Sequence, residues 1–211
     1  MRVLGICFGY TRDIQAAMRW AAGLAVDGVR TNPKPAQVIN LSLGGSAGSC
    51  SPDWSSAVAD VTARGVVVVA AAGNGTGRAA SSPANCPGVI GVAGVRHVGS
   101  KVGFSDIGPE ISIAAPGGNC VNIGAGEPCL YPILSTADSG QTAPQGANYT
   151  SSGDDAAVGT SFSSPLVAAT AALMLSVQPT MTPAAVKSAM QSTARPFPAS
   201  GLPDDPTTGP I

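Results

Sequence analysis

Charged side chains are scarce in this chain: Asp, Glu, Lys and Arg make up 11% of its 211 residues, and the formal net charge is −1. Aromatic residues are also few, at 4%. Because there is no basic block and no interleaving of basic with aromatic residues, we expect no nucleic-acid partner. No uninterrupted apolar run reaches the roughly 18 residues that span a bilayer, so we expect no membrane partner either.

Histidine is rarer still, because His97 is the only one in the chain. It lies in the polar stretch 96–101, which is typical of a turn between two strands. No segment carries the dense pattern of oxygen ligands that calcium sites need, so the sequence predicts no metal site and no cofactor.

The chain has five cysteines, an odd number. Cys120 and Cys129 flank a Gly/Pro-containing loop and are candidates for a short-loop disulfide. Cys50 and Cys86 also lie in loop segments and are a second candidate pair. Each bridge would contribute about 2–4 kcal/mol of stability. Cys7 is then left over, either as a buried free thiol or with a partner outside this sequence.

The length fits one domain with a substantial core. The 27 glycines and 18 prolines separate alternating apolar segments, a pattern that argues against disorder. Apolar runs predict strands at 2–6, 38–41, 66–70, 89–93 and 111–114. Helical spacing predicts helices at 12–26, 51–65, 160–177 and 182–193, and we expect a β-hairpin within 117–158. Strands that alternate with helices predict an α/β fold with a mainly parallel sheet. The chain starts in a strand-like run, so no signal peptide is expected.

The segment Gly159–Pro165, with the sequence GTSFSSP, opens a long apolar run. It places Ser161 at the start of a predicted helix, where unpaired backbone N–H groups and the helix dipole favour negative charge. Ser161 is therefore a candidate nucleophile.

Two predicted strands end in small or polar residues, and sites in parallel sheets form at the carboxyl ends of strands. Ser42, Leu43 and Gly44 follow one strand and could pair with the backbone of an extended peptide. Asn74 follows another strand within 71–75, where its amide could point at a developing oxyanion.

In this order and spacing, the motifs resemble those of the subtilisin-like serine peptidases, the subtilase family. The resemblance covers residues 2–194, through 38–45, 66–74, 82–90, 114–117 and 159–165. It implies a three-layer α/β fold with helices on both faces of the sheet. It also implies a partial catalytic domain at 1–195, followed by a Pro/Asp-rich tail at 196–211. The cysteine-bearing loops are most similar to those of secreted bacterial subtilases, which implies an extracellular parent protein.

The resemblance also implies a role for each candidate residue. Ser161 would be the nucleophile, and Asn74 would donate to the oxyanion together with the Ser161 backbone N–H. The remaining candidates bind substrate: Ser42, Leu43 and Gly44 as the pairing strand, and Ala71, Ala72 and Gly73 as the pocket for the residue before the scissile bond. Family members often bind calcium, although no ligand set is identified here.

The sequence departs from the family in its triad, which runs Asp, His, Ser along the chain. Neither an Asp-(Thr/Ser)-Gly nor a His-Gly-Thr motif occurs. The resemblance therefore implies that the chain lacks the N-terminal part of the domain, which would also hold the partner of Cys7. We expect His97 not to act as the base, and Asp106 and the pair Asp154–Asp155 to be turn residues.

These observations favour a serine hydrolase of the endopeptidase family that is weak or inactive on peptides as this chain. One alternative is an esterase or lipolytic activity on activated esters. Another is a non-catalytic peptide-binding fragment that a missing N-terminal segment completes. The family's aspartate-bearing strand would lie between the strands at 2–6 and 37–41, so we also expect unpaired sheet edges and self-association.

Overall fold

A four-stranded parallel sheet forms the middle layer of the computed structural model, which describes residues 3–5, 8–45, 48–119, 131–140, 142–150 and 157–196. The strands lie in chain order across the sheet and are β1 (Val38–Leu41), β2 (Val67–Ala71), β3 (Val89–Val95) and β4 (Ile111–Pro116). Each neighbouring pair is parallel, so all carboxyl ends lie at one edge of the sheet. The predicted parallel α/β sheet is confirmed.

The continuous apolar run of β2 reflects burial on both faces of the sheet. All five of its residues are buried. Val68 and Ala70 belong to one core cluster, and Val67 and Val69 belong to another on the opposite side. A strand with helices on both faces needs apolar residues at every position, and β2 has them.

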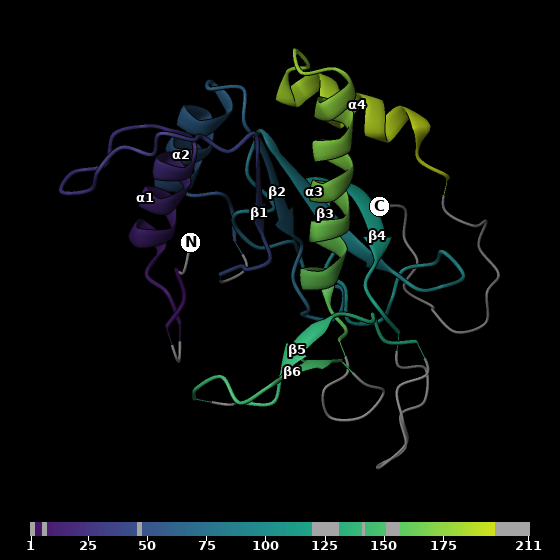
Figure 1. The fold of residues 1–211 in the computed structure, drawn as a ribbon. Helices are drawn as coiled ribbons and strands as arrows, with labels where there is room; N and C mark the ends of the chain where they lie inside the picture. Colours follow the sequence, from purple (N-terminus) through teal and green to yellow (C-terminus); the bar gives the residue numbers. More distant parts are fainter. Residues whose placement is uncertain are drawn as a thin grey trace.

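Two helices cover the first face, α1 (Thr11–Ala21) and α2 (Pro52–Thr62) (Figure 1). The Ser51 side chain caps α2 by accepting from the Trp54 N–H, and Pro52 occupies the first turn, where its missing N–H is not needed. Helix α1 is shorter than the predicted 12–26, because the chain turns at Gly23, which has a φ of +78°.

The opposite face is covered by α3 (Thr160–Val177) and α4 (Pro183–Thr193), which completes three layers (Figure 1). Helix α3 contacts all four strands. By length and composition alone it is long and apolar enough to cross a membrane, although Ser and Thr residues interrupt its apolar run. Its buried side packs on the sheet as a core helix does, through residues such as Val167, Ala171 and Leu175.

The predicted hairpin is present as two short antiparallel strands, β5 (Thr136–Asp138) and β6 (Ala147–Tyr149). It lies below the first turn of α3 in Figure 1, at the end of the molecule where the parallel strands finish.

The predicted strand at 2–6 is not formed by its described residues, 3–5. The Gly5 N–H donates instead to the Phe8 carbonyl at 3.1 Å in a local turn. Among the described residues, β1 pairs on one side only, with β2, so no sheet neighbour is in place to hold 3–5 extended. Within the part of the chain that the structure describes, β1 therefore has the unpaired edge that the sequence led us to expect.

Candidate active site

The predicted site residues converge where the carboxyl ends of β1 and β2 meet the N-terminus of α3. Ser42 directly follows β1, Asn74 lies three residues after β2, and Ser161 is the second residue of α3. These positions are far apart in sequence, and the parallel sheet brings them together.

Asn74 caps α3 from outside the helix. Gly159 precedes the helix and has no side chain to cap it. The Asn74 carboxamide oxygen accepts instead from the Thr160 N–H at 2.9 Å and from the Thr160 hydroxyl at 3.0 Å. The Thr160 hydroxyl in turn accepts from the Gly73 N–H at 3.1 Å. With its oxygen held in this way, the carboxamide is left with its NH₂ group as a donor.

Two glycines leave room for side chains of this site, Gly159 for the Asn74 carboxamide and Gly73 for Asp106. Gly159 has a φ of +140°, and a Cβ placed there would lie 3.1 Å from Asn74 Nδ2. Gly73 has a φ of +119°, and a Cβ placed there would overlap a carboxylate oxygen of Asp106. An L side chain at either position would be strained and crowded.

Pro165 explains how Ser161 is linked to the segment after β1. A proline has no N–H to donate to the carbonyl four residues earlier, which here is that of Ser161. The Ser42 hydroxyl takes that place and donates to the Ser161 carbonyl at 2.7 Å. Asn40 donates to the same Ser42 oxygen at 2.9 Å, and the Ser164 hydroxyl lies 3.0 Å from it. The Ser161 hydroxyl makes only a long contact of 3.4 Å, to the Ser42 carbonyl.

A pocket of about 390 Å³ opens beside Ser161 and Asn74. One wall comes from the segment after β1 and the other from the end of β2 and the loop behind it. Its lining includes the predicted residues Leu43, Gly44, Ala71 and Gly73, and also Ser81 and Asp106.

The prediction for Ala72 needs correcting. Its side chain is fully buried with Ala80, Ala93 and Ile111 and does not line the pocket. Successive residues of an extended segment point to opposite sides, so Ala71 and Ala72 cannot both face the same space.

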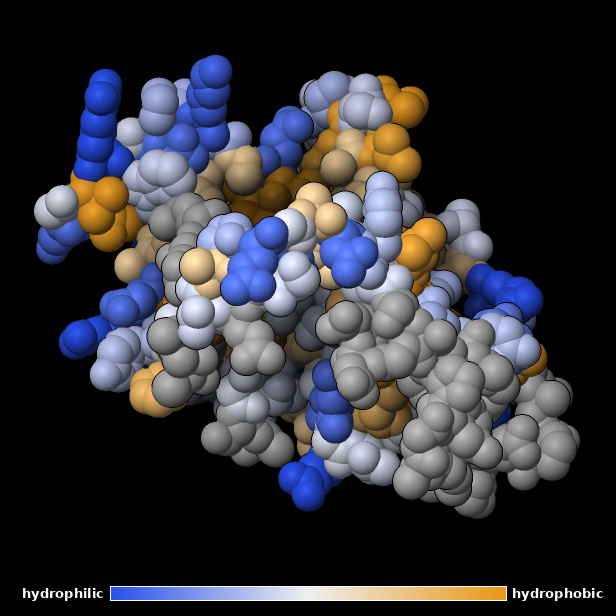
Figure 2. Space-filling view, turned by 60° about the horizontal axis from the view of Figure 1, so that its bottom comes forward, coloured by the Kyte–Doolittle hydropathy of each residue, from blue (hydrophilic) through white to orange (hydrophobic). Residues whose placement is uncertain are grey.

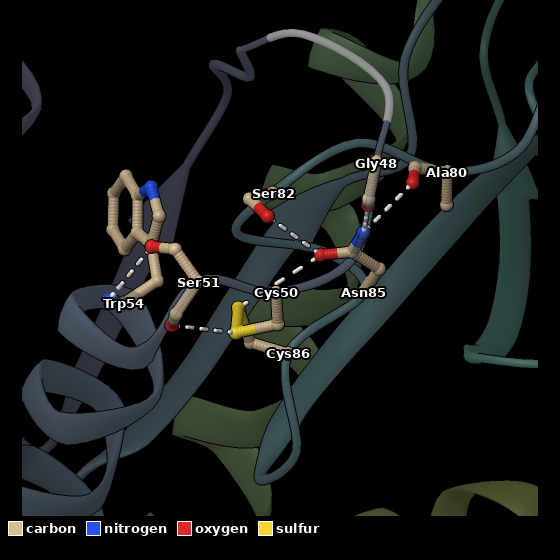
Figure 3. Close-up of a disulfide and its surroundings, with 8 residues drawn as sticks. All are labelled: Gly48, Cys50, Ser51, Trp54, Ala80, Ser82, Asn85 and Cys86. Carbon is tan, nitrogen blue, oxygen red and sulfur yellow. Dashed lines mark hydrogen bonds between the residues drawn. A yellow bond between two sulfur atoms is a disulfide. The ribbon is translucent and has the colours of Figure 1, made fainter.

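A disulfide between Cys50 and Cys86 joins the two loops that carry the pocket walls (Figure 3). Asn85 reinforces it by donating to the carbonyls of Gly48 and Ala80, while Ser82 donates to the Asn85 oxygen at 2.8 Å. The predicted pairing of Cys50 with Cys86 is therefore formed. Cys7, Cys120 and Cys129 lie outside the described residues, as do Asp154 and Asp155.

His97 does not take part in this arrangement. It is exposed, and its ring stacks on Tyr131 with the ring centroids 3.8 Å apart. It lines other pockets, with Val95 and Pro116, and not the one at Ser161. Because it is the only histidine of the 211 residues, no imidazole of this sequence stands next to Ser161.

Sequence reasoning missed Thr160, Ser164 and Ser81, and it assigned Asp106 to a turn. Thr160 lies inside the quoted motif, so its role could have been inferred from the helix start. The other contacts depend on which loops the fold places side by side. Among the described residues, no group of three or more His, Cys, Asp or Glu is placed to hold a metal ion.

Comparison with known proteins identifies the family. A family model described as the subtilase family matches residues 1–208. The chain belongs to the subtilase family. The chain is 43% identical over 202 residues to an extracellular protease of Xanthomonas campestris, covering 95% of this chain and 32% of that protein. It is 36% identical over 202 residues to an extracellular basic protease of Dichelobacter nodosus, covering 93% of this chain and 30% of the relative.

Solved structures of subtilases share the fold. A protease structure from Pseudoalteromonas arctica superposes with a TM-score of 0.84 at 42% identity, covering 94% of this chain and 56% of that one. A cold-adapted subtilisin-like serine proteinase superposes with a TM-score of 0.66 at 28% identity, covering 92% of this chain and 59% of that one. The subtilisin-like three-layer fold is confirmed, and the chain spans about a third of the first two curated relatives.

Proposed function

We propose that this subtilase chain carries the nucleophile, the oxyanion donors and the substrate pocket of a serine endopeptidase. The observation that carries the proposal is the Asn74–Thr160 pair at the start of α3. It orients a carboxamide NH₂ beside Ser161, whose own N–H lies in the first helical turn, where N–H groups have no intrahelical acceptor. Together these two groups would stabilise the oxyanion of a tetrahedral intermediate.

The extended segment after β1 supports a peptide substrate. Ser42, Leu43 and Gly44 follow β1, which lies at the edge of the sheet among the described residues, and Gly44 and Gly45 line the pocket. An extended peptide that pairs with this segment would present one side chain to the pocket and the next carbonyl to Ser161. The relatives named extracellular proteases support a secreted parent protein, and this is part of the proposal.

The general base has to come from outside these 211 residues, because His97 is remote from the pocket. A general base increases the reaction rate by about 10²–10⁴-fold, and amide hydrolysis also needs a general acid that protonates the leaving group. We therefore propose that the isolated chain is weak or inactive on peptides. For the same reason, slow hydrolysis of activated esters is the second candidate function, because such esters need no protonation of the leaving group.

Chemical rescue tests the proposal. A serine-directed fluorophosphonate should label the 211-residue chain slowly at Ser161, and free imidazole should accelerate labelling because it replaces the absent base. Ser161→Ala should abolish the labelling. Ser176→Ala, at the exposed far end of the same helix, should leave it unchanged. No labelling in the presence of imidazole, or equal labelling of Ser161→Ala, would show that this serine is not a nucleophile.

Substrate comparison separates the two hydrolytic activities. The isolated chain should release p-nitrophenol from an activated ester faster than it releases p-nitroaniline from the matching peptide anilide. Rapid anilide hydrolysis that Ser161→Ala removes would contradict the proposed need for an external base.

A further inference from the structure

The pocket beside Ser161 has an almost neutral lining. Its described lining residues are glycine, alanine, leucine, serine, threonine and asparagine, apart from Asp106 and Arg78. In such a pocket, a single charged group has a large effect on which side chain binds. The position and the ion pairing of these two residues therefore determine which substrate side chains the pocket accepts.

Asp106 lies behind the pocket wall formed by residues 73–75. Its N–H donates to the Gly73 carbonyl at 2.9 Å, and its Oδ1 accepts from the backbone N–H of Arg78 at 3.0 Å. A Cβ on Gly73 would overlap Asp106 Oδ2, and a Cβ on Gly75 would lie 3.0 Å from it. The carboxylate therefore occupies the space that these two glycines leave empty.

The carboxylate of Asp106 has no cationic partner in the described part of the chain. The ion pairs found there are Arg12–Asp13 and Arg19–Asp60. Arg78 gives Asp106 its backbone N–H, but its own side chain is exposed, and no ion pair joins the two. Asp106 is only 6% exposed, so its charge has little bulk water to solvate it. A desolvated carboxylate with an unused acceptor oxygen is a site for a cation.

We propose that Asp106 determines the specificity of this pocket and selects a peptide residue with a cationic side chain, lysine or arginine, before the scissile bond. The inference rests on the proposed function, because the pocket binds the residue before the scissile bond only if Ser161 attacks the carbonyl of that residue. The ammonium or guanidinium group donates to Asp106 Oδ2, and the aliphatic stem lies between Leu43 and the glycines of the wall.

Paired peptides test this inference on the 211-residue chain itself. Acetylated pentapeptide amides carry lysine or its neutral isostere norleucine at the selected position, and a second pair carries arginine or citrulline. Affinity is measured by isothermal titration calorimetry. Each cationic peptide should bind about tenfold more tightly than its neutral isostere, as a charge-assisted hydrogen bond provides.

Two variants assign the preference to Asp106. Asp106→Asn keeps the shape and the acceptor for the Arg78 N–H, and it should reduce the ratio within each pair to about one. Glu110→Gln removes the same charge from an exposed side chain that does not line the pocket, and it should leave the ratio near tenfold. Because the peptide pairs are compared on the unmodified chain, the test does not depend on the folding of a variant.

The outcomes separate this inference from the proposed function. Equal binding of charged and neutral peptides, or a preference that survives in Asp106→Asn, would overturn the role of Asp106 and leave the proposed function intact. If no peptide binds although Ser161 is labelled, the specificity inference alone fails. If no peptide binds and Ser161 is also unreactive, the proposed function fails with it.

Discussion

Thr160 is the residue through which α3 and the Asn74 loop contact one another. It is fully buried, and its hydroxyl both accepts from the Gly73 N–H and donates to the Asn74 oxygen. Its backbone N–H also donates to that oxygen. A single side chain thus fixes the direction of the carboxamide and the position of the loop that carries it.

Replacing Thr160 with valine keeps the volume and removes the hydroxyl. We expect Thr160→Val to slow the imidazole-rescued labelling of Ser161 by about tenfold, since displaced catalytic groups cost up to about 10²-fold. It should also lower the free energy of unfolding by about 1 kcal/mol, because the partly buried Gly73 N–H loses its acceptor. Labelling rates and urea unfolding measure the two effects.

Thr170→Val is the matched control for this prediction. Thr170 is an exposed residue of the same helix whose hydroxyl donates to the Leu166 carbonyl. The control should change stability by less than about 0.5 kcal/mol and leave labelling unaffected. A folded Thr160→Val protein that is labelled at the normal rate would show that the orientation of the Asn74 carboxamide does not depend on the Thr160 hydroxyl.

Among the secondary-structure elements, the β5–β6 hairpin holds one carboxylate through hydrogen bonds from its own backbone. The Asp138 carboxylate accepts from the N–H groups of Gly140 at 2.8 Å, Gln145 at 3.0 Å and Gly146 at 3.1 Å. These hydrogen bonds favour the charged form and lower the pKa of Asp138 below its ordinary value of 3.8, with that from Gln145 contributing most.

The lowered pKa predicts a loss of hairpin order in acid. A carboxyl group whose pKa is lower in the folded state stabilises that state above its unfolded pKa of 3.8, and the contribution disappears as pH falls through the folded-state value. Amide hydrogen exchange at Gly140, Gln145 and Gly146 should therefore gain an extra acid-dependent opening below about pH 3.8. Asp138→Asn should remove this pH dependence, and identical opening in both proteins would contradict the assignment.

At the scale of the whole molecule, a strand edge and an apolar helix face lack a partner among the described residues. Strand β1 has an unpaired edge, and on α3 the side chains of Leu166, Leu173 and Val177 are 43%, 68% and 87% exposed. Figure 2 shows apolar surface in the hollow between the α1–α2 side and the α3–α4 side of the molecule. Open edges and exposed apolar faces of this kind favour association with another chain.

We therefore expect the 211-residue chain to self-associate at micromolar concentration. Leu173→Glu should shift the distribution towards monomer by at least about tenfold in dissociation constant, because burying an unpaired carboxylate is unfavourable. Sedimentation velocity over a range of concentrations measures the effect. Ser188→Glu, an exposed change on α4, is the control and should leave association unchanged. A wild-type chain that stays monomeric throughout would contradict the prediction.

The sequence by itself determined most of the elements and pointed to the central residues of the proposed site, because these follow from local patterns. The apolar run of β2, the capped starts of α2 and α4, and the motif around Ser161 are each contained in a few consecutive residues. Ser161 and Asn74 could be named for the same reason. The division between a domain at 1–195 and a tail at 196–211 remains a prediction.

Only the tertiary structure decided which of these segments contact one another. Asp106 is 28 residues from Arg78 in the sequence, and it reaches the pocket because β3 returns the chain to the side of β2. Residues 3–5 have a strand-like sequence, but strand structure needs a hydrogen-bonding neighbour, and the described sheet offers them none. Pairing, burial and charge compensation depend on distant segments, which no local pattern specifies.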